Sequence, residues 1–274
     1  MVSRTTDDYA AMAAAGCVAI CEPAFWAGFD RGSPDGFRDY FRQITEVEPK
    51  RAAAHGIAHY CWLCINPKEA EDAGFAREVM SLLPEFLDAG NVLGIGEIGL
   101  NKNTRNELEI FEAHVTLAAE RNLPILIHTP HLEDKLKGTR LMLDALRNHP
   151  EIDRSRVVID HVEEHTIAAV LDQGYWAGMT LYPISKCTPA RAVDMVECFG
   201  NERVWLNSAC DWGVSDPIAV VKAGLEMRRR GHGRALVDKL LLRNPAAFLS
   251  ACPGWRNRPP VDFPLETFPS PREG

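Results

Sequence analysis

The chain has 274 residues, of which 46% are hydrophobic and 25% charged, so it is long enough to bury the core of one large domain. Its net charge of −8 excludes the basic surface on which sequence-independent binding along long duplex nucleic acid depends. It does not exclude a phosphate ester as a substrate, because a bound metal ion can supply the local positive charge.

The cysteine pattern and the N-terminal residues predict a cytoplasmic protein. The eight cysteines are scattered through strand-like and helix-like stretches, which favours a reducing compartment over a disulfide framework. The first residues lack the basic, apolar and small-residue regions of a signal peptide, and no apolar run approaches the length of a membrane span. We therefore expect no contact with a membrane.

Predicted strands and helices alternate along the chain. The opening segment, 3–16, has the pattern of a helix that Ser3, Thr5 or Thr6 can cap and that Gly16 ends. The predicted strands cover residues 17–23, 57–67, 92–100, 124–129, 157–162, 175–182 and 203–210. The predicted helices that follow them cover 36–55, 69–89 (bent near Pro84), 105–122, 136–148, 166–174, 189–199, 217–230 and 233–250.

This alternation predicts an α/β fold in which helices cover a parallel sheet. Glu97, His128 and His161 lie at the ends of three consecutive strands and are 31 and 33 residues apart, and a (β/α)₈ barrel of ~250 residues has about 31 per unit. With seven strands preceded by a helix, the pattern is that of a TIM-type barrel that lacks its first strand. A doubly wound open sheet is the alternative, although its GxGxxG turn does not occur in the sequence.

The expected domain organisation is simple. Residues 1–252 form one barrel domain, and residues 253–274 form a tail with six prolines that drapes over the surface or is disordered. A barrel that lacks a strand has two unpaired edges, so association of subunits through those edges is expected.

Four polar residues end apolar runs on four different strands: Glu97 in GIGEIGL, His128 in ILIHTPH, His161 in VVIDHVEE and Asp211 in LNSACDW. In a barrel of this type, the residues of the active site come from the carboxyl ends of the strands and the loops after them. A single histidine at a strand end is more often structural, but four matched strand ends favour a metal site. Two imidazoles and two carboxylates suit Zn²⁺, Mn²⁺ or a similar ion, which makes hydroxide available near neutral pH.

These motifs resemble the TatD family of metal-dependent hydrolases, in the amidohydrolase superfamily. GEIGL, PILIH, a strand ending in histidine and a strand ending in aspartate before tryptophan occur in the family's order, and LRNPAAF resembles its C-terminal helix. The resemblance spans residues 3–249. It implies a (β/α)₈ barrel with one or two divalent ions (Zn²⁺, Mn²⁺ or Mg²⁺). Glu97 would bridge the ions, His128 and His161 would hold one, and Asp211 would bind the other and act as the general base.

The sequence departs from the family pattern in two places, and these departures limit the metal content and the activity that the resemblance implies. The H-x-H pair of the family's first strand is absent, and its place would fall just before Met1. The His–Pro–His element of the third strand is replaced by Ile65–Asn66–Pro67–Lys68. We therefore expect at most one tightly bound metal ion per protomer. The second departure also weakens the transfer of deoxyribonuclease activity.

Three further residues are candidates for substrate binding. Glu22, at the end of the second strand of the full barrel, either contacts the substrate or caps a loop. Trp26 either forms a wall of the pocket or packs its own loop. His131 either contacts a substrate anion or supports the ligands. The predicted reaction is metal-dependent hydrolysis of a small or terminal phosphate ester, an amide or a lactone. The alternative is a catalytically impaired barrel that binds a ligand or serves as a scaffold.

Overall fold

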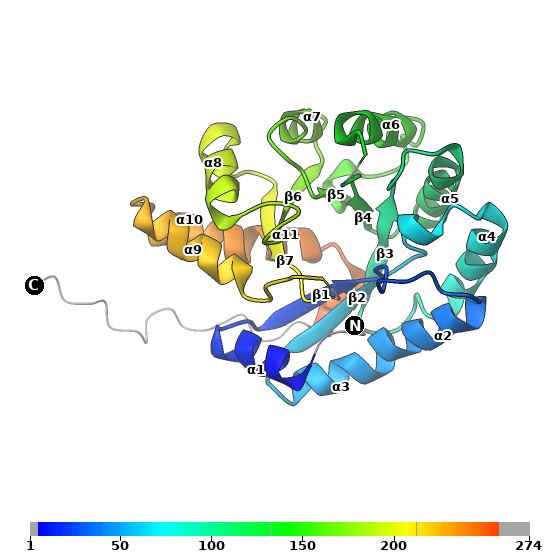
Figure 1. Ribbon diagram of the computed structural model, residues 1–274, viewed down its shortest axis with the longest axis horizontal. Coiled ribbons are helices and arrows are strands. Elements are labelled where there is room, and N and C mark those ends of the chain that lie inside the picture. The colour runs from blue at the N-terminus through cyan, green and yellow to red at the C-terminus, as the bar shows by residue number, and fades with distance from the viewer. Residues whose placement is uncertain (1–4, 132, 212, 258–274) are drawn as a thin grey trace, which may run out of the picture.

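The computed structural model describes residues 5–131, 133–211 and 213–257. Seven parallel strands form one sheet, paired in the order in which they occur in the chain. They are β1 (Ala19–Pro23), β2 (Ala58–Leu63), β3 (Val92–Gly99), β4 (Ile125–His128), β5 (Val157–Asp160), β6 (Trp176–Leu181) and β7 (Val204–Ser208). The sheet curls into a half-barrel with helices around its outside (Figure 1), and the strand order of the described residues has β1 and β7 at its two edges. The predicted parallel α/β fold with seven strands is confirmed.

The helices lie close to their predicted positions. They are α1 (Thr6–Ala14), α2 (Pro34–Arg42), α3 (Glu48–Ala53), α4 (Ala73–Leu82), α5 (Arg105–Arg121), α6 (Lys135–Arg147), α7 (Ile167–Asp172), α8 (Pro189–Phe199), α9 (Ala219–Arg229), α10 (Arg234–Asp238) and α11 (Asn244–Leu249). Two π-helical turns, η1 (Gln43–Val47) and η5 (Lys239–Arg243), divide the predicted helices 36–55 and 233–250. Short 3₁₀ turns are η2 (Pro67–Glu69), η3 (Leu83–Glu85), η4 (Arg154–Arg156) and η6 (Pro253–Asn257). Across the described ranges, every helix is too short or too polar to cross a membrane.

Local sequence signals explain where the helices begin and end. Thr5 accepts a hydrogen bond from the backbone N–H of Asp8, whose carboxylate accepts from the backbone of Thr5, so a capping box starts α1 and Thr5, one of the three candidates, is the cap. Thr104 and Glu107 form the same arrangement at the start of α5. Pro84 lies in η3 directly after α4, because proline lacks the N–H that would continue the helix.

The two faces of the sheet are buried in different ways. The outward-facing side chains, such as Ile127 and Ile159, pack under the surrounding helices. On the inner face Phe248 of α11 contacts the rings of Trp62, Trp176 and Trp205, with ring centroids 6.2, 5.6 and 5.0 Å away. The last helix therefore closes the inner core of the half-barrel.

The beginning of the predicted tail also belongs to this core. Trp255 in η6 is buried, and its ring centroid lies 4.6 Å from that of Tyr60 on β2. The rest of the predicted tail, 258–274, lies outside the described residues.

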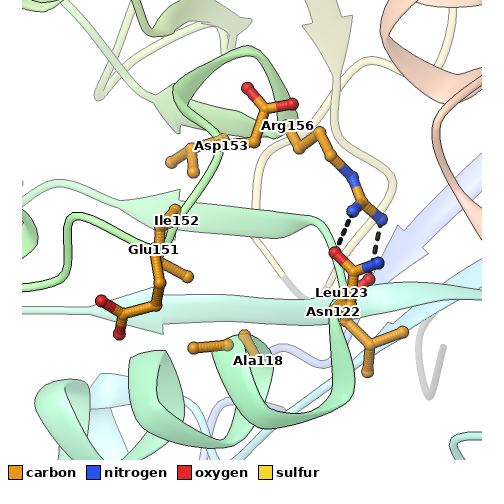
Figure 2. Close-up of a pocket in the computed structure, with 9 residues that line it drawn as sticks. Ala118, Asn122, Leu123, Glu151, Ile152, Asp153 and Arg156 are labelled. Carbon is orange, nitrogen blue, oxygen red and sulfur yellow. Dashed lines mark hydrogen bonds between the residues drawn. The ribbon is translucent and has the colours of Figure 1, made fainter.

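A small pocket lies at the amino ends of β4 and β5 (Figure 2). The guanidinium of Arg156 closes one side and donates to Asn122, at 2.5 Å to Oδ1 and 2.8 Å to the backbone carbonyl oxygen. These bonds tie the end of α5 to the start of β5. Because barrel active sites form at the opposite edge of the sheet, we assign this pocket a structural role.

Candidate metal centre

Three predicted ligands come together at the carboxyl edge of the sheet. Glu97 lies near the end of β3, His128 ends β4, and His161 follows β5, and these strands are neighbours. The Oε1 of Glu97 is 2.7 Å from His161 Nε2 and 3.0 Å from His128 Nδ1. The two ring nitrogens are 3.0 Å apart. All three residues are buried, so three ligand atoms converge on one point inside the protein.

His128 stabilises the charged form of Glu97. Burial raises the pKa of this carboxyl group, but the charge and the hydrogen bond of His128 oppose burial, and the pKa lies well below its ordinary value. The Nδ2 of Asn66 donates to the other carboxylate oxygen at 3.3 Å. Glu97 is therefore a carboxylate at neutral pH and can act as a metal ligand.

A hydrogen-bonded chain fixes the orientation of the His161 ring. Asp160 accepts from the hydroxyl of Thr180 at 3.0 Å and from Asn207 at 2.9 Å. Because the Thr180 hydroxyl donates to Asp160, its oxygen accepts from His161 Nδ1 at 2.7 Å. The proton of the ring is then on Nδ1, and the lone pair of Nε2 faces Glu97 and His128. This arrangement of an outer partner holding a ligating histidine is common at metal sites.

The backbone around His161 is also constrained. His161 has a φ of 61°, in the left-handed region that few residues other than glycine adopt. Lys135 is buried and donates to the backbone carbonyl oxygen of His161 at 2.7 Å. Gly178 provides room for Asp160, since a Cβ at this position would lie 2.4 Å from the Asp160 carboxylate.

The arrangement fits a single divalent cation. Two imidazole nitrogens and a carboxylate oxygen are the donors that Zn²⁺ and similar ions take in catalytic sites with three protein ligands. Burial, followed by the charge of Lys186, lowers the pKa of His161 to about 4, so the ring is neutral at pH 7. The Nε2 of His128 is buried and has no hydrogen-bond partner among the described residues. The ring proton can therefore lie on Nε2, which leaves the lone pair of Nδ1 free to bind a cation.

Asp211, the predicted fourth ligand and general base, lies beyond the three-residue cluster. Its Oδ1 accepts from the hydroxyl of Tyr182 at 2.9 Å and from the backbone N–H of Gly213 at 3.0 Å. Its charge acts on Lys68 and Lys186, and both lysines also interact with Glu97. Asp211 therefore lies in the loop after β7, near the lysines that also interact with Glu97, and its role in catalysis stays a prediction.

The remaining candidates lie in different places. Glu22 is buried and its Oε2 is 2.7 Å from His59 Nε2, so it forms a pair separate from the three-ligand cluster. The Trp26 indole donates to Asp30 at 2.7 Å, and its ring faces Lys68. The pKa of His131 is lowered by burial and then by nearby positive charges, among them Lys186 and His128. Trp26 and His131 are thus near the mouth, while Glu22 is turned to another partner.

Sequence reasoning missed the residues that support the ligands. Asp160 ends β5 and precedes His161 directly, and Thr180 is the next-to-last residue of the apolar strand β6, so their positions near strand ends were the available signal. Lys68 and Lys186 follow β2 and β6, but single lysines in loops carry no recognisable pattern. Only the curvature of the sheet brings these loops to one site.

Comparisons with known proteins agree with this geometry. A model of the family described as TatD related DNase matches residues 40–193. An uncharacterized metal-dependent hydrolase from Methanocaldococcus jannaschii is 26% identical over 248 residues, which cover 89% of this chain and 95% of that protein.

Solved structures show the same architecture. A TatD-like protein from Archaeoglobus fulgidus is 29% identical, with a TM-score of 0.73 over 91% of this chain and 96% of that one. A phosphotriesterase homology protein from Escherichia coli, solved with phosphate in its active site, shares the fold at 19% identity, with a TM-score of 0.60 over 89% and 88% of the two chains. The family match, the relatives and the buried cluster of Glu97, His128 and His161 lead to one conclusion: the chain belongs to the TatD-related DNase family of metal-dependent hydrolases.

Proposed function

We propose that this protein hydrolyses a small or terminal phosphate ester, an amide or a lactone with one divalent metal ion at Glu97, His128 and His161. The single observation that carries the proposal is the convergence of three ligand atoms within 3.0 Å of one another at the carboxyl edge of the sheet. A divalent ion bound there supplies a Lewis acid for a substrate oxygen and lowers the pKa of a bound water.

The protein's own residues supply the remaining parts of the reaction. Thr180 and Asp160 hold the His161 ring in the tautomer that binds a cation. Oδ1 of Asp211 is held by Tyr182 and Gly213, so we assign Oδ2 as the atom that accepts a proton from the attacking water. Asn66 keeps the Glu97 carboxylate in place at the edge of the cluster.

The test is hydrolysis of a chromogenic phosphomonoester, a phosphodiester, an amide and a lactone with added Mn²⁺ or Zn²⁺. Asp211→Asn should remove turnover while metal content stays unchanged. Asp88→Asn is the matched control, because Asp88 is exposed and lies in the turn before β3. Absence of metal-dependent turnover with all four substrates, in protein that binds metal, would contradict the proposal and favour the ligand-binding alternative.

A further inference from the structure

A buried lysine bonds to the backbone of one of the predicted metal ligands. Lys135 begins α6, and its Nζ donates to the backbone carbonyl oxygen of His161 at 2.7 Å. The hydroxyl oxygen of Thr129 and Oε1 of Glu163 lie 3.4 Å and 3.3 Å from the same nitrogen. The Lys135 side chain is only 7% exposed. Burying an ammonium group is costly unless it is paired and hydrogen-bonded, and these three acceptors meet that requirement.

The two peptide groups on either side of the His161 Cα are held by residues that follow β4. The Thr129 hydroxyl lies within hydrogen-bonding distance of both carbonyl oxygens, 2.9 Å from that of Asp160 and 3.2 Å from that of His161. Lys135 donates to the second of these oxygens. Because the orientations of the two peptide groups define φ and ψ of His161, Thr129 and Lys135 fix the backbone conformation of a residue that follows the next strand.

This conformation needs such support. The φ of His161 is 61°, in the left-handed region, which residues other than glycine keep only where the surrounding structure holds them. The N–H of Val162 donates to the carbonyl oxygen of Gly178 at 3.0 Å, so the peptide group after His161 is held from one side by β6 and from the other by Lys135. From this turn, Nε2 of His161 reaches Glu97 at 2.7 Å. A change in the turn would therefore move a ligand atom.

We propose that Lys135 and Thr129 are positioning residues for the metal centre and act through the backbone of His161. Thr180 sets the rotation of the His161 ring, whereas Lys135 and Thr129 set the backbone from which the ring projects. Thr129 directly follows His128, so the segment after one ligand holds the backbone of the other. The inference rests on the metal site of the proposed function and does not depend on the substrate.

The surroundings of Lys135 allow its ammonium group to be removed. The Glu163 side chain is 22% exposed, and its Oε2 lies 3.7 Å from a guanidinium nitrogen of Arg191 on α8. Without Lys135, the Glu163 carboxylate keeps contact with water and with Arg191. The carbonyl oxygen of His161 keeps the Thr129 hydroxyl. A variant without the ammonium group is therefore expected to fold.

Binding of Co²⁺ tests the inference without a substrate. Co²⁺ accepts the same imidazole and carboxylate donors as Zn²⁺, and its visible absorption depends on the geometry of those donors. Lys135→Met keeps the unbranched stem and removes the ammonium group, so we expect the Co²⁺ affinity to fall about tenfold and the visible absorption to change. Thr129→Val, which removes the hydroxyl and keeps the shape of the side chain, should act in the same direction. Lys137→Met is the matched control, because Lys137 is exposed on α6.

A purely structural role predicts a different result. Lys135→Met would then lower the free energy of unfolding of the metal-free protein, measured in urea, and leave the Co²⁺ affinity and spectrum of the folded protein unchanged. That result would overturn the inference. The conservative variants Lys135→Arg and Thr129→Ser keep the donors and should restore most of the affinity. If Lys135→Met does not fold, Thr129→Val decides, and full affinity with an unchanged spectrum would again overturn the inference.

Hydrolysis measured on the same samples separates this inference from the proposed function. Weakened Co²⁺ binding in Lys135→Met and Thr129→Val, with no hydrolysis of the four substrates by the unaltered protein, would refute the proposed function and leave the positioning role intact. Metal-dependent hydrolysis by the unaltered protein, with full Co²⁺ affinity in both variants, would refute only the positioning role. An unaltered protein that takes up no Co²⁺ would refute both.

Discussion

Among the described residues of the half-barrel, two buried groups combine carboxylate and imidazole, and they differ in how many ligand atoms meet. Glu22 and His59 lie on β1 and β2 and are joined by a hydrogen bond of 2.7 Å. Glu97 meets two imidazoles at once, and the ring nitrogens of those imidazoles also face each other. The first group is a closed pair, whereas the second has three ligand atoms directed at one point.

The two groups also differ in their surroundings: one is packed inside the protein and the other lies at the carboxyl edge of the sheet. Glu22 lies close to Tyr40 of α2, whose pKa is raised by burial and then by the Glu22 charge, so this pair packs between the sheet and its helices. The cluster at Glu97 lies at the carboxyl edge, where Lys68 and Lys186 approach it. A buried acid and a buried imidazole therefore do not by themselves indicate a metal site. Convergence of three ligand atoms at the functional edge of the sheet does.

The largest difference between the groups should appear when a ligand is removed. His161→Ala takes away one of three protein ligands, and we expect metal affinity to fall by more than about 100-fold, the upper end of the loss seen when an outer partner is removed. Competition with a chelator measures the affinity. His165→Ala, an exposed histidine in the same segment, is the control and should bind metal normally. Equal affinity in the two variants would rule out His161 as a ligand.

Breaking the closed pair should affect stability and leave metal binding unchanged. His59→Leu leaves the buried Glu22 carboxylate without its 2.7 Å partner, and we expect the free energy of unfolding to fall by about 3 kcal/mol. Urea denaturation and metal analysis of the same samples provide both values.

The surface pair of His149 and Glu151 gives the matched control for that experiment. Glu151 is half exposed in this pair, so His149→Leu should leave the free energy of unfolding nearly unchanged. A loss of bound metal in His59→Leu without a loss of stability would show that the pair of Glu22 and His59 supports metal binding and not the fold.

A smaller effect is expected from the chain that orients His161. Thr180→Val keeps the shape of the side chain but removes the hydroxyl between His161 and Asp160, and metal affinity should fall about 10-fold to 100-fold. The same chelator assay applies. Thr116→Val, on the exposed side of α5, should have no effect. Full affinity in Thr180→Val would show that packing alone orients the ring.

The smallest effect concerns Glu48, a third buried carboxylate, which accepts hydrogen bonds from Tyr9, Gln43 and Arg51. Burial raises its pKa, but the hydrogen bond from Tyr9 and the other polar interactions of the carboxylate outweigh burial, and the pKa is lowered to about 2. The folded-state pKa lies below the unfolded value, so the stabilisation is complete above about pH 4.5 and is lost as the pH falls towards 2. Glu48→Gln should remove about 2 kcal/mol of the change in unfolding free energy across this range. An equally steep pH profile in the variant would assign the change to other groups.

The fold was predictable because its signals are local. The run from Val92 to Gly99 is apolar and bounded by turn residues, and the other strands repeat the pattern at regular spacing. The boundaries were less predictable. The helical periodicity continues across both π-helical turns, and the signal that marks them is a proline. Pro49 of α3 follows η1 and Pro245 of α11 follows η5, and proline lacks the N–H that a regular α-helix would use there.

The site was predictable only as far as residue type and strand ends carry information. Glu97, His128 and His161 are polar residues in apolar runs, so their convergence follows from neighbouring parallel strands. The pairing of Glu22 with His59 depends on which side of the strand each side chain faces. The approach of Lys68 and Lys186 to the cluster depends on the conformations of the loops after β2 and β6. No short sequence pattern predicts these loop conformations.

The position of Phe248 has a consequence for how the protein is made. Trp62, Trp176 and Trp205 come from strands that are synthesised well before α11, and their rings are covered only when Phe248 arrives. A nascent chain that has not yet released α11 from the ribosome therefore carries an uncovered aromatic surface at the centre of an open sheet, the kind of surface that draws chaperones or aggregates. The inner core of the half-barrel can therefore close only after the chain has been synthesised as far as α11.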